Sequence, residues 1–136
     1  GDSDAQYNLG VAYDDGEGVE QDHKQAVTWY RKAAAQGHSR AQFNLAVSYD
    51  DGEGVPQDFK QAVYWYTQAA NQGLAKAQYN LGVSYDKGEG VAKDHQMAAQ
   101  WYRKAAGRPT FGKCGTSKWP RSNLTATAFC KTATSK

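Results

Sequence analysis

The chain has 136 residues, enough for one domain with a modest core. Its net charge of +2 conceals a division, because all 14 acidic residues precede Arg108. Residues 1–106 carry ten basic against fourteen acidic side chains, a net charge of −4, and residues 107–136 carry +6. No apolar run approaches the roughly 20 residues that a membrane-spanning helix needs, so we expect no membrane span.

One pattern recurs three times at a spacing of 36 residues: it occupies residues 5–34 and returns at 41–70 and 77–106. Such a period is typical of a solenoid, in which each unit buries its apolar face against the next. We therefore divide the chain into repeats at 1–36, 37–72 and 73–106 and a non-repeat segment at 107–136. Gly1 falls at the repeat position of Gly37 and Gly73, so we expect the chain to be a trimmed or processed form.

The first half of each unit predicts a helix, over residues 4–15 in the first copy. At 100° per residue, Ala5, Leu9 and Ala12 share one apolar stripe. Gly10 borders this stripe. Because glycine inside a helix costs up to about 1 kcal/mol relative to alanine, Gly10 predicts a neighbouring helix that passes close by.

The second half of each unit predicts a glycine turn and a second helix. Residues 16–19 supply the turn, since glycines just past a helix end adopt the left-handed conformation. Asp22 is expected to cap the second helix, with Gln25 completing a capping box. The buried stripe of this helix is predicted to use tryptophan as its large side chain and alanines as the spaces between; in the first copy it comprises Ala26, Trp29, Tyr30, Ala33 and Ala34.

The residues common to the three copies resemble the Sel-1-like repeat, a relative of the tetratricopeptide repeat with a longer turn. In the first copy the matching residues are Ala5, Leu9, Gly10, Tyr13, Gly16, Gly18, Val19, Asp22, Ala26, Trp29, Tyr30, Ala33 and Ala34. The resemblance implies an all-α, right-handed superhelical solenoid of antiparallel helix pairs. It also implies an adaptor in signalling, bacterial host interaction or membrane-protein quality control. The repeats lack the internal disulfide of the cysteine-rich branch, and the third unit breaks off early at Gly107.

In a tetratricopeptide-like array, the side of the first helix opposite the core stripe lines a concave groove. Stacked repeats would align an aromatic row, a valine row and an aspartate row on this side. The rows are Tyr7, Phe43 and Tyr79; Val11, Val47 and Val83; and Asp14, Asp50 and Asp86. Such a strip suits an extended peptide or a partner helix, so we expect a non-enzymatic scaffold that binds a protein or peptide there.

Alternatives remain open for each part of this face. The aromatic and valine side chains can instead form a second layer of core, and the aspartates can be solvated residues at a helix end. Asn8, Asn44 and Asn80 also recur, and we expect them to bond between helices. The competing hypothesis for the whole chain is a structural fragment without a dedicated ligand that associates end to end.

The sequence offers no arrangement typical of an enzyme, and we expect no cofactor and no metal. His23 and His95 lie two repeats apart, on the order of 20 Å given the usual helix spacing, whereas zinc ligands lie within about 2 Å of one centre. Phe59 occupies the same position in the second copy and interrupts the histidines. Residues 107–114 match the spacing of a phosphate-binding loop, but Cys114 stands where serine or threonine belongs.

The non-repeat segment is predicted to contain a short amphipathic helix between Pro120 and Thr132 and to cap the third repeat, with Leu124, Phe129 and Trp119 covering its apolar face. Cys114 and Cys130 would close a disulfide in an oxidising compartment, and a bacterial periplasmic or secreted location is favoured if they are bridged. The alternatives are a disordered basic extension or a sequence foreign to the family. Its basic residues are scattered, so nucleic acid is not an expected partner.

Overall fold

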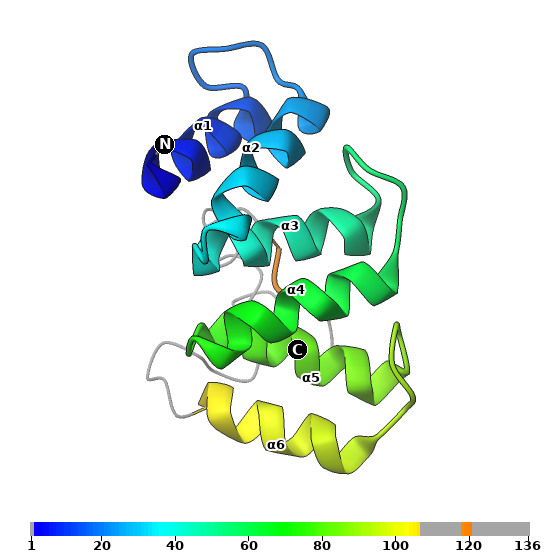
Figure 1. Cartoon of the computed structure of the whole chain (residues 1–136). Helices are drawn as coiled ribbons and strands as arrows, with labels where there is room; N and C mark the ends of the chain where they lie inside the picture. Colours follow the sequence, from blue (N-terminus) through cyan, green and yellow to red (C-terminus); the bar gives the residue numbers. More distant parts are fainter. Residues whose placement is uncertain (1, 107–117, 121–136) are drawn as a thin grey trace, which may run out of the picture.

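The computed structural model describes residues 2–106 and 118–120, and all regular structure within them is helical (Figure 1). The helices are α1 (Ser3–Asp15), α2 (His23–Ala35), α3 (Ser39–Asp51), α4 (Phe59–Asn71), α5 (Ala75–Lys87) and α6 (His95–Ala106). Each helix packs against the next one along the chain, so three antiparallel pairs stack into the expected helical solenoid. None of these helices is long and apolar enough to cross a membrane.

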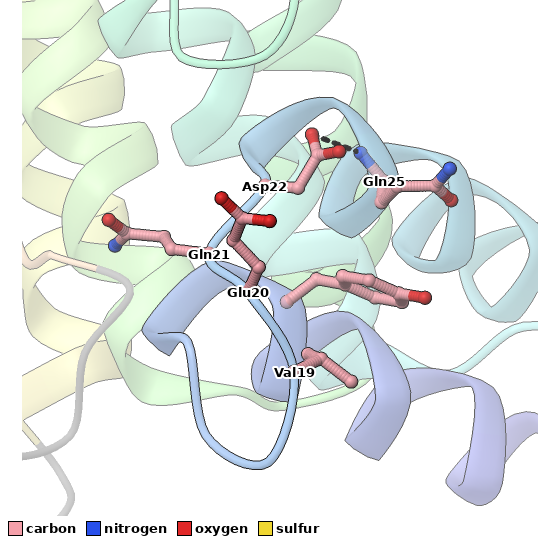
Figure 2. Close-up of a pocket in the computed structure, with 6 residues that line it drawn as sticks. Val19, Glu20, Gln21, Asp22 and Gln25 are labelled. Atoms are coloured by element: carbon pink, nitrogen blue, oxygen red, sulfur yellow. Dashed lines mark hydrogen bonds between the residues drawn. The ribbon is translucent and has the colours of Figure 1, made fainter.

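The predicted turns and aspartate caps are confirmed, but the second half of the capping box is not, because the backbone N–H of Asp22 donates to the carbonyl oxygen of Tyr13 at 2.8 Å and not to the Gln25 side chain. Gly16 ends α1 with a left-handed φ of 73°. The Asp22 carboxylate accepts hydrogen bonds from the backbone N–H groups of Lys24 and Gln25 at 3.1 and 3.2 Å, the second of which is drawn in Figure 2. Asp58 and Asp94 cap α4 and α6 in the same way. Figure 2 draws the residues that line a pocket beside the first turn, which are Tyr13, Val19, Glu20, Gln21, Asp22 and Gln25.

Tyrosine, not tryptophan, is the large core side chain of the second helices. Tyr30 and Tyr66 are 1% and 0% exposed, whereas Trp29 and Trp65 are only partly buried. The prediction that tryptophan fills this place was therefore wrong. At 100° per residue from Ala26, the tyrosine falls at 40°, inside the alanine stripe, and the tryptophan falls at 300°, on its flank. From the flank, Trp65 contacts the apolar clusters on both sides of it.

The close helix approach predicted from Gly10 is confirmed. A Cβ atom placed on Gly10 would lie 2.7 Å from the ring of Tyr30, and one placed on Gly82 would lie 2.7 Å from the ring of Tyr102. The tyrosine rings therefore pack directly on the backbone of the preceding helix.

Part of the predicted cap falls on residues whose placement is not described. Leu124, Phe129, Cys114 and Cys130 all lie outside the described residues. The cap formed by the first two and the disulfide between the last two stay predictions.

The second glycine of the turn has the same left-handed backbone conformation in the first two repeats, but its surroundings differ. Gly54 and Gly18 have φ values of 80° and 76°. A Cβ atom on Gly54 would collide with the carbonyl group of His23, whereas none of the described atoms comes within 4 Å of a Cβ atom on Gly18.

We expect Gly54→Ala to lower the free energy of unfolding by at least about 1 kcal/mol more than Gly18→Ala, because only the former adds overpacking to a shared left-handed strain. Urea unfolding followed by circular dichroism measures both. Equal losses would contradict the contact between this turn and α2.

Candidate functional site

The three predicted rows lie on the side of α1, α3 and α5 that we call the A-helix face. Its exposure varies along the stack: Phe43 and Val83 are 0% and 1% exposed, and Tyr79 is 7% exposed. Tyr7 and Val11, on α1, are only partly buried. The buried aromatic and valine members, which include Val47, share one apolar cluster with Trp119.

The aromatic row packs against the tyrosines of the second helices. The Tyr7, Phe43 and Tyr79 rings lie 6.0, 5.9 and 5.4 Å from the rings of Tyr30, Tyr66 and Tyr102, respectively. These are the contacts of a second core layer, the alternative left open by the sequence. A role for the same rings in partner binding stays a prediction.

The aspartate row is anchored by the same tyrosines. Asp14, Asp50 and Asp86 accept hydrogen bonds from the tyrosine hydroxyl groups of their own repeats at 3.0, 2.8 and 3.5 Å. Asp14 and Asp50 are 7% and 8% exposed, so the alternative of solvated helix ends was wrong for these two. Burial, and then the charge of Asp50, raise the pKa of Tyr66, which keeps its hydroxyl group protonated as a donor.

Each aspartate also contacts a nitrogen group of a second side chain. This side chain comes from the start of the second helix of the repeat or from the segment 118–120. His23 Nδ1 lies 2.7 Å from Asp14 Oδ1, and His95 Nδ1 lies 2.5 Å from Asp86 Oδ1. The equivalent residue in the second repeat is Phe59, which cannot form this bond. There, the ammonium group of Lys118 donates to Asp50 Oδ2 at 2.7 Å.

Lys118 belongs to the segment 118–120, which lies against α3 and α5 (orange in Figure 1). The backbone N–H of Trp119 donates to Asn80 Oδ1 at 2.7 Å, and Asn80 Nδ2 donates to the carbonyl oxygen of Trp119 at 3.0 Å. Lys118 Nζ donates a second hydrogen bond, to Glu89 Oε1, at 3.0 Å. The site therefore holds both the main chain and the side chains of a segment remote in sequence.

The expected cap position of Trp119 needs correction. Its indole is 8% exposed and lies in the cluster that includes Phe43 of α3 and Val83 of α5. It thus covers the A-helix face of the second and third repeats instead of only the end of the stack. The two hydrogen bonds to Asn80 explain this position, since they satisfy main-chain groups that would otherwise be buried without partners.

Three residues of this site, Asn80, Phe59 and Glu89, were not predicted as site residues from the sequence. Asn80 Nδ2 does lie 3.4 Å from the hydroxyl group of Tyr66, the bond between helices that was expected, but its shorter bonds go to Trp119. The recurrence of asparagine in every repeat was the available signal. Among residues 2–106 and 118–120, no three histidine, cysteine, aspartate or glutamate side chains form a group that could hold a metal ion.

Comparison with known proteins assigns the repeats. The family model described as Sel1 repeat matches residues 3–38, 39–74 and 75–108. The crystal structure of c5321, a protective antigen of uropathogenic Escherichia coli strains displaying an SLR fold, is similar with a TM-score of 0.78 and 47% identity, over 79% of this chain and 23% of that protein. A Sel1 repeat protein from Oxalobacter formigenes is similar with a TM-score of 0.76 and 44% identity, over 78% of this chain and 44% of that protein. The chain thus spans less than half of either protein, and no curated protein matches it.

The ion pair between Lys118 and Asp50 provides a test of how the segment 118–120 binds to the repeats. Their side chains are 14% and 9% exposed. In a double-mutant cycle with Lys118→Met and Asp50→Asn, we expect a coupling free energy of about 1.5–3 kcal/mol, typical of hydrogen bonds to charged groups.

The control is the pair of His38 and Asp4, whose aspartate side chain is 80% exposed. Screening by solvent should keep its coupling below about 1 kcal/mol. Urea unfolding measures both coupling free energies. A coupling free energy between Lys118 and Asp50 no larger than that of the control pair would contradict the position of the segment 118–120.

Proposed function

Because the chain belongs to the Sel1 repeat family, whose repeats generally mediate protein interactions, we propose that its A-helix face binds a peptide segment of a partner protein. The observation that carries this proposal is the pair of hydrogen bonds between Asn80 and the main chain of Trp119. Bonds to the main chain give affinity for any peptide of suitable shape, and the surrounding side-chain pockets give specificity.

We infer that an extended segment suits the site best. Residues 118–120 adopt neither helix nor strand. Trp119 precedes Pro120, and the residue before a proline is biased toward β and polyproline conformations. An extended partner segment would present its N–H and carbonyl groups to Asn80 as Trp119 does.

The energetics of the internal segment allow a partner to replace it. Burying the indole of Trp119 contributes roughly 4–6 kcal/mol at about 25 cal/mol per Å², whereas ordering three residues costs about 3–6 kcal/mol. The two terms nearly cancel, which leaves the hydrogen bonds to decide occupancy. A partner that adds contacts beyond these three residues would therefore compete well.

The charge of the repeats favours a basic partner segment. Residues 1–106 carry a net charge of −4, and Asp50 and Glu89 both accept hydrogen bonds from the ammonium group of Lys118, the residue before Trp119. Complementary charge raises association rates and selects against acidic segments.

End-to-end self-association is a second candidate function, favoured by the exposure of α1. Leu9 is partly buried and Ala5 is exposed, whereas the equivalent Leu45 and Ala41 are each 0% exposed. Light scattering over a concentration series distinguishes the two: a mass that stays monomeric throughout would exclude self-association.

A synthetic peptide tests the main binding function. The peptide reproduces residues 115–122 and carries a fluorescent label, and its anisotropy is measured with the full chain and with a Lys118→Ala/Trp119→Ala variant. We expect the variant to bind the peptide at least about 10-fold more tightly, because its own segment no longer competes.

In the same background, Asn80→Ala should weaken peptide binding about 10-fold or more, since two hydrogen bonds of about 1 kcal/mol each are lost. Asn8→Ala is the matched control, because Asn8 holds the same repeat position on α1 and is exposed. Circular dichroism verifies the fold of each variant. Peptide binding that does not depend on Asn80 would contradict the proposal.

A further inference from the structure

Two equivalent sets of side chains border the A-helix face, one between the first and second repeats and one between the second and third. Each set takes an aspartate and a tyrosine from one repeat and an asparagine and a glutamate from the next. The sets are Asp14, Tyr30, Asn44 and Glu53, and Asp50, Tyr66, Asn80 and Glu89. They differ at one further position, which is His23 in the first set and Phe59 in the second.

In the first set, the chain's own histidine lies between the two carboxylates. His23 Nδ1 lies 2.7 Å from Asp14 Oδ1, and its Nε2 lies 3.8 Å from Glu53 Oε2. The place between the aspartate of one repeat and the glutamate of the next is therefore filled from within α2.

In the second set, the same place holds a cation from outside the repeats. Lys118 Nζ lies 2.7 Å from Asp50 Oδ2 and 3.0 Å from Glu89 Oε1. The two sets thus hold a nitrogen group between equivalent carboxylates, which comes from His23 in the first set and from a separate segment in the second.

The phenylalanine also contributes to the binding of this ammonium group. Lys118 Nζ lies 5.7 Å from the ring centre of Phe59 and 5.6 Å from that of Tyr66, both within the roughly 6 Å of a cation–π contact. Only 14% of the Lys118 side chain is exposed. Two carboxylates and two aromatic rings therefore surround a compact cation that is largely removed from water.

We propose that Asp50, Phe59, Tyr66 and Glu89 form a lysine subsite, and that the partner segment carries a lysine directly before an aromatic residue whose main chain pairs with Asn80. This inference rests on the proposed function and specifies its ligand. Exchange of histidine for phenylalanine at position 59 opens the subsite, while His23 keeps the equivalent place in the first repeat closed. The segment 118–120 is an internal copy of the ligand and competes with it.

The charge of the ligand is tested with two labelled peptides and the full-length Lys118→Ala/Trp119→Ala variant. One peptide reproduces residues 115–122, and the other has norleucine, a neutral side chain of similar length, in place of its lysine. We expect the norleucine peptide to bind about 10-fold to 100-fold more weakly, because it makes no charge-assisted hydrogen bond.

The role of position 59 is tested by adding Phe59→His to the same variant. Its imidazole should occupy the place between Asp50 and Glu89, as His23 does in the first repeat. Affinity for the lysine peptide should then fall to that of the norleucine peptide, whose own affinity should change little. His95→Phe, the reverse exchange at the same repeat position on α6, is the matched control and should leave both affinities unchanged.

The outcomes separate this inference from the function on which it rests. Equal binding of both peptides, with both weakened by Asn80→Ala, would overturn the lysine subsite and leave the peptide-binding face in place. Preference for lysine that persists in the Phe59→His variant would overturn the assignment of position 59. Failure of both peptides to bind a correctly folded variant would overturn the subsite and the peptide-binding function together.

Discussion

The hydrogen bond from a second-helix tyrosine to a first-helix aspartate is the interaction on which the site depends. Tyr66 fills the core of its repeat, being 0% exposed, and its hydroxyl group reaches Asp50 at 2.8 Å. One side chain therefore joins the two helices and fixes a carboxylate on the A-helix face. The aspartate lies near the C-terminal end of its helix, where the helix dipole disfavours negative charge, so it needs these donors to remain there.

Near-identical repeats carry nearly identical sets of side chains. Small differences between the copies then determine which group each set contacts. Asp14 and Asp50 are equivalent and anchored alike, but the first contacts His23 and the second contacts Lys118. Because the contacts of Lys118 and Trp119 also use residues of the third repeat, here Glu89 and Asn80, they form only when the repeats stack in register.

The features predicted correctly from the sequence are the local ones. Helix pairs, the aspartate caps and the left-handed glycines follow from residues a few positions apart, and Gly10 predicted a close helix because its conformational cost needed a reason. The prediction of Trp29 as the large core residue failed because it followed side-chain size, whereas the helical angle places Tyr30 inside the alanine stripe and Trp29 on its flank. The burial of Asp50 was missed because its donor Tyr66 is 16 residues away. The pairing of Asn80 with Trp119 spans 39 residues and joins a repeat to a segment without periodicity, so no sequence pattern predicted it.

Amide hydrogen exchange at Trp119 is the most direct test of the central claim that Asn80 holds the main chain of a bound segment. The account predicts that the Trp119 N–H exchanges far more slowly than in a free peptide and that Asn80→Ala removes this protection while the amides of α3 and α4 keep theirs. If the Trp119 amide hydrogen exchanged at the free-peptide rate in the unaltered chain, this result would contradict the claim.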